Sequence, residues 1–269
     1  MTPSFVHLHL HTEFSIVDSV VRVKDLMAAT AKAEMPAVAL TDQNNLFALV
    51  KFYRAAHKAG LKPIIGAEVW FRAHAEDQLS RLILLCRNNQ GYQNLSRLLT
   101  RAFLEGLQDG VPIINRGWLE EGVTDGLIAL SGGREGCIGR LLLAGQLDLA
   151  GGVLNELRDL FAGDFFIELQ RTGRQYEREY LAAAVELAAT HGCPVVATND
   201  VRFLRPEDFE AHEARVCIQQ GCVLDDPNRP RDYSEQQYLR SPDEMAELFA
   251  DLPEALTNSV EIAKRCNVG

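Results

Sequence analysis

The stretch Val6-His7-Leu8-His9-Leu10-His11-Thr12, near the start of the chain, alternates apolar residues with histidines. Residues two apart in a β-strand point to the same face, so we expect the three histidines to share one side of a first strand, residues 5–11. Neighbouring imidazoles on that side can reach one metal ion, whereas the alternative is a polar strand face that is open to solvent. Three of the seven histidines in the chain lie here, which favours the metal-binding interpretation.

Six further β-rich runs follow, and several are continuously apolar, as expected of parallel strands that are buried on both faces. These runs are residues 37–41, 63–71, 82–86, 127–131, 165–169 and 194–198. Most are separated by helical patterns, of which the clearest are residues 44–59, 91–103 and 175–190. Residues 72–80, between the third and fourth runs, are too few and too polar for a crossover helix, so a hairpin-like link is expected there.

Alternating strands and helices predict an α/β fold with a parallel sheet, either open and doubly wound or closed into a barrel. No Gly-x-Gly-x-x-Gly motif follows the first strand, which counts against a dinucleotide-binding sheet. Polar residues gather at the ends of the strands, where a (β/α) barrel carries its active site. They are His9, His11, Asp42, Glu68 and Thr198-Asn199-Asp200. We therefore expect a distorted (β/α)7 barrel over residues 1–204, ending with the strand at 194–198.

Residues 205–269 have a different character and are expected to form a helical extension packed on the barrel. Residues 206–219 and 253–266 have helical patterns. Ser241-Pro242-Asp243-Glu244 has the sequence of a helix start, with a serine cap, a proline in the first turn and a glutamate partner. The chain stops three residues after the last predicted helix, so we expect it to be a piece of a longer protein.

The composition excludes several classes of function. Asp and Glu number 37 against 27 Lys and Arg, a net charge of −10, which is the opposite of a surface built to bind DNA tightly. No apolar run reaches the roughly 18 residues of a membrane-spanning helix, and the N-terminus does not resemble a secretory signal, so a cytoplasmic protein is expected. The six cysteines form no Cys-x-x-Cys pair, which favours free thiols over disulfides or a zinc site.

The motif His9-x-His11-Thr12-x-x-Ser15, followed by Asp18, resembles the first motif of the PHP (polymerase and histidinol phosphatase) family. Segments similar to its later motifs occur in order: Leu40-Thr41-Asp42, Pro63-Ile64-Ile65-Gly66-Ala67-Glu68, Asn89-x-Gly91-Tyr92, Ser131-Gly132-Gly133 and Thr198-Asn199-Asp200-Val201. Leu224-Asp225-Asp226-Pro227 and the last helix are similar to the branch found in bacterial replicative DNA polymerase III alpha subunits. The resemblance covers the whole chain and implies the N-terminal part of such a polymerase, without its polymerase active site.

The resemblance also implies a cluster of metal ions, and only some of its ligand positions are kept here. His9, His11, Asp18, Glu68 and Asp200 agree with the family pattern, whereas Gln43, Arg81 and Arg202 stand where histidine is expected and Gly133 where cysteine is expected. In the family, His9, His11, Glu68 and Asp200 correspond to the ligands of one ion, which makes them a candidate four-coordinate zinc or manganese site. Asp18 corresponds to a ligand of a different ion, whose other ligands are missing.

The two arginines at former ligand positions suggest a replacement for the metal. Arginine cannot ligate because its guanidinium stays protonated, but it can supply positive charge where a cation would lie. We therefore expect Arg81 and Arg202 within about 4 Å of Asp18, Glu68 or Asp200, and lowered pKa values for these carboxylates. The alternative for each arginine alone is a solvated surface charge.

Two functions remain open. The resemblance implies a structural module that binds the proofreading exonuclease (epsilon) subunit and the remaining polymerase domains, and that needs no cofactor. The alternative is an active metal-dependent phosphoesterase or pyrophosphatase, whose chemistry requires metal-activated water. The four missing ligands favour the first function, and no catalytic residues are then expected in this part of the polymerase.

Overall fold

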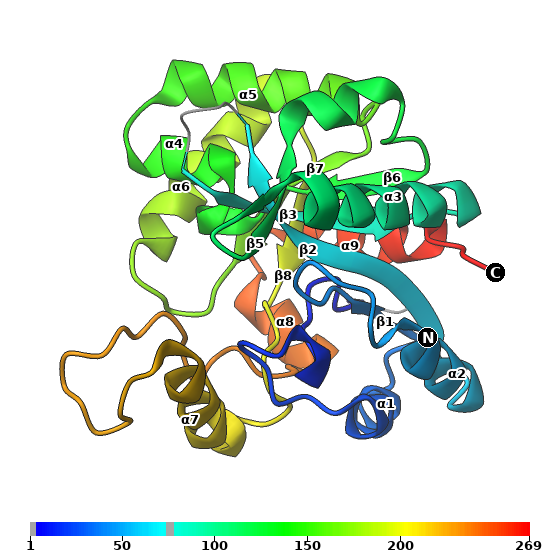
Figure 1. Cartoon of the computed structure of the whole chain (residues 1–269), viewed down its shortest axis with the longest axis vertical. Helices are drawn as coiled ribbons and strands as arrows, with labels where there is room; N and C mark the ends of the chain where they lie inside the picture. The colour runs from blue at the N-terminus through cyan, green and yellow to red at the C-terminus, as the bar shows by residue number, and fades with distance from the viewer. Residues whose placement is uncertain (1–3, 74–77) are drawn as a thin grey trace.

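The computed structural model of the chain describes residues 4–73 and 78–269, and shows a mixed β-sheet surrounded by helices (Figure 1). The strands are β1 (Ala37–Leu40), β2 (Lys62–Arg72), β3 (Ser80–Cys86), β4 (Leu107–Gln108), β5 (Val111–Asn115), β6 (Leu127–Leu130), β7 (Phe165–Gln170) and β8 (Val195–Thr198). The α-helices are α1 (Val23–Lys32), α2 (Leu49–Lys58), α3 (Asn89–Glu105), α4 (Cys137–Leu143), α5 (Leu147–Leu160), α6 (Glu177–His191), α7 (Phe209–Gln220), α8 (Pro242–Leu248) and α9 (Pro253–Arg265).

The strand directions are mixed, so the predicted parallel pairing holds for part of the sheet and fails at β3. Strand β3 runs antiparallel to both of its neighbours, β2 and β6, whereas β1 and β2, β6 and β7, and β7 and β8 pair in parallel. The predicted link at residues 72–80 explains the reversal, because a short link can return the chain only in the antiparallel direction. Residues 74–77 of that link lie outside the described residues, but the antiparallel pairing on either side of it confirms a hairpin-like connection.

Residues 5–11, the predicted first strand, form an extended segment rather than a regular strand. On one side, the backbone N–H of Ala39 in β1 donates to the carbonyl of His7, at 2.9 Å. On the other side, the N–H of Val201, just after β8, donates to the carbonyl of His9, at 3.1 Å, and the N–H of His11 returns a bond to Val201, at 3.0 Å. The segment therefore joins the two ends of the sheet, and the seven predicted runs close into a distorted barrel.

The inside of the barrel is filled with apolar side chains from all seven runs. They include Val6, Leu8, Ala39, Ile64, Ile83, Leu85, Ile128, Leu130, Phe166 and Val196. Helix α9 packs on this cluster and bonds to the starts of the parallel strands. Ser259 Oγ accepts from the N–H of Val6, at 3.1 Å, and Asn258 donates to the carbonyl of Val195, at 2.8 Å. The carboxyl ends of the parallel strands lie at the opposite end, where the polar residues gather.

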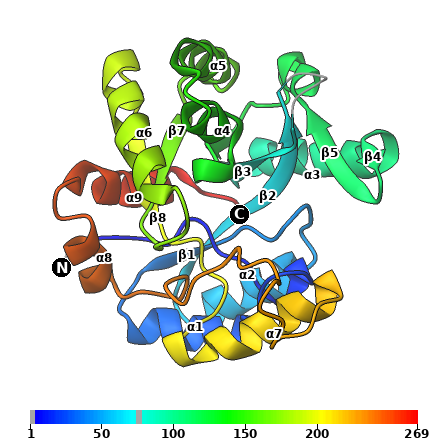
Figure 2. The same cartoon turned by 90° about the vertical axis from the view of Figure 1, so that its left-hand side faces the viewer.

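Helices cover the outside of the strands in two groups. Figure 2 shows α4, α5 and α6 on one side of the strands and α1, α2 and α7 on the other. Strands β4 and β5, together with helices α4 and α5, were not predicted from the sequence. Strand β5 contains Pro112, which weakens a strand pattern, yet it pairs in parallel with the outer part of β2.

The extension has the predicted helices. Residues 206–219 correspond to a short 3-10 turn followed by α7, and residues 253–266 correspond to α9. The Ser241 side chain accepts from the N–H of Glu244, which bonds back to the N–H of Ser241, so the predicted cap of α8 is confirmed. The division at residue 204 remains a prediction.

Across the described ranges, no helix is long and apolar enough to cross a membrane. All six cysteines lie in those ranges, and no disulfide joins them.

Candidate metal centre

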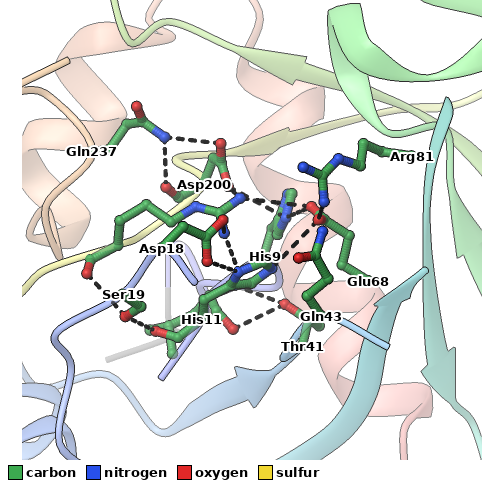
Figure 3. A network of polar contacts seen from close by, with 12 residues as sticks. His9, His11, Asp18, Ser19, Thr41, Gln43, Glu68, Arg81, Asp200 and Gln237 are labelled. Carbon is green, nitrogen blue, oxygen red and sulfur yellow. Dashed lines mark hydrogen bonds and ion pairs between the residues drawn. The ribbon is translucent and has the colours of Figure 1, made fainter. Parts of the chain in front are cut away.

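Polar side chains from the carboxyl ends of the strands meet in one buried cluster (Figure 3). His9 Nε2 lies 2.8 Å from Glu68 Oε2 and 3.3 Å from Asp200 Oδ1. His11 Nδ1 lies 2.9 Å from Asp18 Oδ1, and His11 Nε2 lies 3.7 Å from Glu68 Oε1. The structure therefore brings all five retained positions together. One ligand atom from each of His9, His11 and Glu68 lies within 4.8 Å of the other two, which is close enough to surround one ion.

Arg202 lies in the middle of these carboxylates. Its side chain is 2% exposed, and its guanidinium reaches three acids. Nη1 lies 2.7 Å from Asp18 Oδ2, whereas Nη2 lies 2.5 Å from Asp200 Oδ1 and 3.6 Å from Glu68 Oε2. Nη1 also contacts the Nδ1 atom of His11. The predicted proximity of Arg202 to the carboxylates is confirmed, and a solvated surface charge is excluded.

Arg81 approaches the same cluster from its outer side. It is the cross-strand partner of Trp70 in the β2–β3 ladder, and its guanidinium stacks 3.8 Å from the centre of the indole ring. Its Nη1 atom bonds to Glu68 Oε1, which confirms the predicted ion pair (Figure 3). The Arg81 side chain is 14% exposed, so this pair is more accessible to water than the pairs of Arg202.

Two charged residues of the cluster were missed by the sequence analysis. Glu168 in β7 accepts a 2.7 Å hydrogen bond from His9 Nδ1. Arg174, in the loop after β7, places Nη1 at 3.1 Å from Asp200 Oδ2 and donates from Nη2 to Gln170, at 2.7 Å. Glu168 is an acid inside an otherwise apolar strand run, which was a usable signal. No comparable signal distinguishes Arg174 from an ordinary loop arginine.

Comparison with known proteins gives the family of the chain. A family model described as the PHP domain matches residues 7–172, more than half of the sequence. The chain belongs to the PHP domain family. Over its whole length it is 58% identical to the DNA polymerase III subunit alpha of Pseudomonas aeruginosa, and over 99% of its length it is 52% identical to that of Escherichia coli strain K12. The chain spans 23% of the length of each of these relatives.

The ion pairs keep the carboxylates of this PHP domain ionised. Burial alone raises the pKa of each acid, but nearby cations outweigh it: Arg202 at Asp18, Arg81 at Glu68, and Arg202 again at Asp200. The predicted lowering of the pKa of these three carboxylates is therefore confirmed. Burial likewise lowers the pKa of His9, but the neighbouring Glu168 and Asp200 carboxylates outweigh it and raise the pKa to about 10.

His7 lies apart from the cluster, so the prediction that three histidines share one face is wrong. Its Nε2 atom donates to the backbone carbonyl of Arg240, at 2.8 Å, and its ring packs edge-on against Phe5, with the ring centres 4.8 Å apart. Burial lowers the pKa of His7 to about 4, so the ring is neutral. Because residues 5–11 are not a regular strand, strict alternation does not hold along them.

Several motif residues of the PHP domain shape a loop instead of contributing to the ion pairs. Asp42, at the end of β1, accepts from the N–H of Thr12 at 2.6 Å, from the Thr12 hydroxyl at 2.8 Å and from the Ser15 hydroxyl at 2.7 Å. These bonds fix residues 12–15, the start of the loop that carries Asp18. Burial raises the pKa of the Asp42 carboxyl group.

The two uncharged positions, Gln43 and Gly133, offer little to a metal ion. The Nε2 atom of Gln43 is buried and finds no hydrogen-bond partner among the described residues. Gly133 has a φ angle of +59°, and a Cβ atom there would lie 3.1 Å from Oε1 of Gln170. A cysteine at position 133 would therefore be strained and would displace Gln170.

The side chains of the cluster are of types that bind metal ions, but arginines already neutralise its carboxylates. Two imidazoles and a carboxylate are a common zinc set, and His11 Nε2 is buried with no hydrogen-bond partner in the described part of the chain. However, Arg81 and Arg202 already occupy oxygens of Glu68 and Asp200. An ion could enter only by displacing these cations, so the cluster does not fit the multi-metal centre implied by the family.

Proposed function

We propose that this PHP domain is the N-terminal part of a bacterial replicative DNA polymerase III alpha subunit. In this proposal it acts as a structural module and binds the proofreading exonuclease (epsilon) subunit during chromosomal replication. In this proposal the domain needs no metal and catalyses no reaction of its own. The observation that carries it is the position of Arg202, whose guanidinium lies between Asp18 and Asp200 where the family pattern calls for a metal ligand.

The proposal interprets the ion pairs as a degenerate metal site. Phosphoester hydrolysis by a metal cluster needs bound ions to activate water and to neutralise the developing charge. Here Gln43, Arg81, Gly133 and Arg202 stand at the positions whose ligands are lost. Guanidinium groups supply the positive charge that the carboxylates require, but they cannot generate a metal-bound hydroxide. The cluster then stabilises the barrel instead of performing chemistry.

The proposed partners follow from charge and family. A chain with a net charge of −10 is poorly suited to bind DNA tightly by itself, so its contacts are proposed to be with proteins in the cytoplasm. These are the epsilon subunit and the remaining domains of the polymerase. The polymerase reaction itself is assigned to those remaining domains.

Gel filtration of the chain with the purified epsilon subunit tests the binding proposal. We expect the two to co-elute at micromolar concentration, and we expect no DNA binding of similar strength at low salt. Separate elution would contradict the proposed partner. Salt-sensitive DNA binding as strong as the protein contact would contradict the assignment of the domain as a protein-binding module.

A metal-dependent phosphoesterase is the second candidate function. It is favoured by His9, His11 and Glu68, whose ligand atoms lie within 4.8 Å of one another. Assays with p-nitrophenyl phosphate in the presence of manganese or zinc distinguish the two functions. Turnover that is lost in a His9→Gln variant would support this second candidate, whereas no turnover with either metal supports the structural role.

A further inference from the structure

The extension contributes two side chains to the ion cluster. The hydroxyl of Tyr233 donates to Asp18 Oδ2, at 3.0 Å. The amide of Gln237 donates both to Asp200 Oδ2, at 2.9 Å, and to the backbone carbonyl of Asp200, at 3.1 Å (Figure 3). Gln237 is completely buried, although it lies far along the chain from the barrel strands. Both residues belong to the segment between α7 and α8; we name residues 233–240 the closing segment.

Backbone bonds hold the closing segment against the chain that follows β8. The N–H of Arg202 donates to the carbonyl of Gln237, at 2.9 Å, and the N–H of Leu239 donates to the carbonyl of Phe203, at 3.2 Å. The side-chain amide of Asn199 donates to the carbonyls of Gln236 and Tyr238, both at 2.8 Å. Residues 236–239 of the closing segment are thus hydrogen-bonded to residues 199–203, which include Asp200 and Arg202.

Asp18 is held by the extension through both its side chain and its backbone. His212 in α7 places Nε2 at 3.0 Å from the carbonyl of Asp18. The ring of Tyr233 packs edge-on against His212, with the ring centres 4.8 Å apart, and the Arg202 guanidinium lies 5.8 Å from the centre of the Tyr233 ring. Tyr233 therefore contacts both the acid and its main counter-charge.

These contacts leave the two aspartates with little capacity for another ligand. Asp200 Oδ1 contacts Arg202 and His9, and Asp200 Oδ2 contacts Arg174 and Gln237. Asp18 Oδ2 has a similar pair of partners, Arg202 and the hydroxyl of Tyr233. A carboxylate oxygen offers about two lone-pair sites, so two donors saturate it.

We propose that Tyr233 and Gln237 are positioning residues of the ion cluster, and that the closing segment holds Asp18 and Asp200 in place against Arg202. The inference rests on the proposed function, because it assumes that the cluster works without metal. A neutral donor is suited to the position of Gln237, since Arg174 and Arg202 already balance the charge of Asp200. A carboxylate there would add an uncompensated negative charge in a buried site.

The substitution Gln237→Glu tests this inference with almost no change in shape. It keeps the oxygen that accepts from the N–H of Ser234, at 3.0 Å, but removes both bonds donated to Asp200 and adds a like charge. Gln236→Glu is the matched control. It makes the same chemical change one residue away, where the side-chain oxygen accepts from Arg240 and a carboxylate gains a counter-charge.

Amide hydrogen exchange of the full chain is the measurement. In Gln237→Glu we expect the N–H groups of Arg202 and Leu239 to exchange about 10- to 100-fold faster, as expected for the loss of a hydrogen bond to a charged group. In Gln236→Glu their rates should match the unsubstituted protein. The N–H of Ile167, which bonds to Pro194 between β7 and β8, is the internal reference and should not change. Equal rates for Arg202 and Leu239 in the two variants would overturn the proposal.

Tyr233→Phe is a second, milder variant in case Gln237→Glu does not fold. It keeps the ring against His212 and removes only the hydroxyl bond to Asp18. We expect a few-fold faster exchange at Val20, whose N–H bonds to the carbonyl of Arg202, and unchanged exchange would count against the role of Tyr233. Added zinc separates this proposal from the proposed function: strong stabilisation of the unsubstituted protein would contradict a metal-free cluster, whereas the exchange rates alone decide the role of the closing segment.

Discussion

The two ends of the barrel are held together by different chemistry. Toward α9, apolar side chains such as Leu8 and Ile83 fill the interior, whereas at the rim Asp18, Asp200 and Arg202 form ion pairs that are almost completely buried. A lost apolar contact costs in proportion to the cavity it leaves. A lost ion-pair partner instead leaves an uncompensated buried charge. The stability of the rim therefore depends on charge balance, whereas the stability of the interior depends on the volume that its side chains fill.

The largest effect is expected for Arg202→Met, which removes the central cation of the rim. Three carboxylates then lose a counter-charge, and breaking such a buried pair costs about 3–5 kcal/mol of unfolding free energy. Urea unfolding measures the difference. If the cause is charge, adding Asp18→Asn to Arg202→Met should recover part of the loss, and no recovery would point to lost packing.

A comparable but slightly smaller effect is expected for Leu8→Ala in the interior. Leu8 is completely buried, and truncating a core leucine costs about 2–5 kcal/mol through lost burial and the remaining cavity. Urea unfolding at low and high salt sharpens the comparison, because this loss should not depend on ionic strength. A marked salt dependence for Leu8→Ala would contradict the distinction between the two ends.

Arg81→Ala should have a smaller effect than Arg202→Met. Arg81 pairs with Glu68 and stacks on Trp70, but its side chain is 14% exposed, so water can partly replace it. We expect a loss of about 1–3 kcal/mol, between the values for exposed and buried pairs. The same urea titration compares the two arginines directly, and an equal loss for both would show that burial does not decide the cost.

The smallest expected effect concerns alkaline pH. The folded pKa of His9 is raised to about 10 from a usual 6.5, so its ion pairs contribute fully below pH 6.5 and are lost as the pH rises toward 10. From pH 7 to pH 8 this linkage removes about 1 kcal/mol of unfolding free energy. Urea midpoints across that range measure it. The slope should flatten in His9→Gln, and an unchanged slope would assign the effect to another group.

Much of the fold could be predicted because strand runs and helix caps are local signals. All seven runs lie in the barrel, and the cap of α8 at Ser241 forms as predicted. The run that forms β3 and the hairpin-like link before it were predicted, but the antiparallel pairing of β3 with β6 was not, because strand direction depends on how the chain returns and not on the composition of the strand. His7 was misplaced for a related reason: strict alternation requires a regular strand, and residues 5–11 form an extended segment that is not a regular strand.

Only those cluster residues that stand at positions of the family pattern could be predicted. Arg81 and Arg202 stood at expected ligand positions, so their pairing with the acids could be inferred. Arg174, Tyr233 and Gln237 could not be found in this way, because their contacts join segments far apart in the chain and none of them belongs to a motif. Tertiary packing alone brings them to Asp18 and Asp200.

The most direct test of the central claim, that arginines replace metal at the rim, is the metal content of the purified chain after dialysis against zinc or manganese. A variant with histidine restored at three positions, Gln43→His, Arg81→His and Arg202→His, is the comparison; Gly133 stays unchanged because its backbone disfavours a side chain. We predict less than one ion per unsubstituted chain and a clear gain in the restored variant. One or more tightly bound ions in the unsubstituted chain would contradict the account.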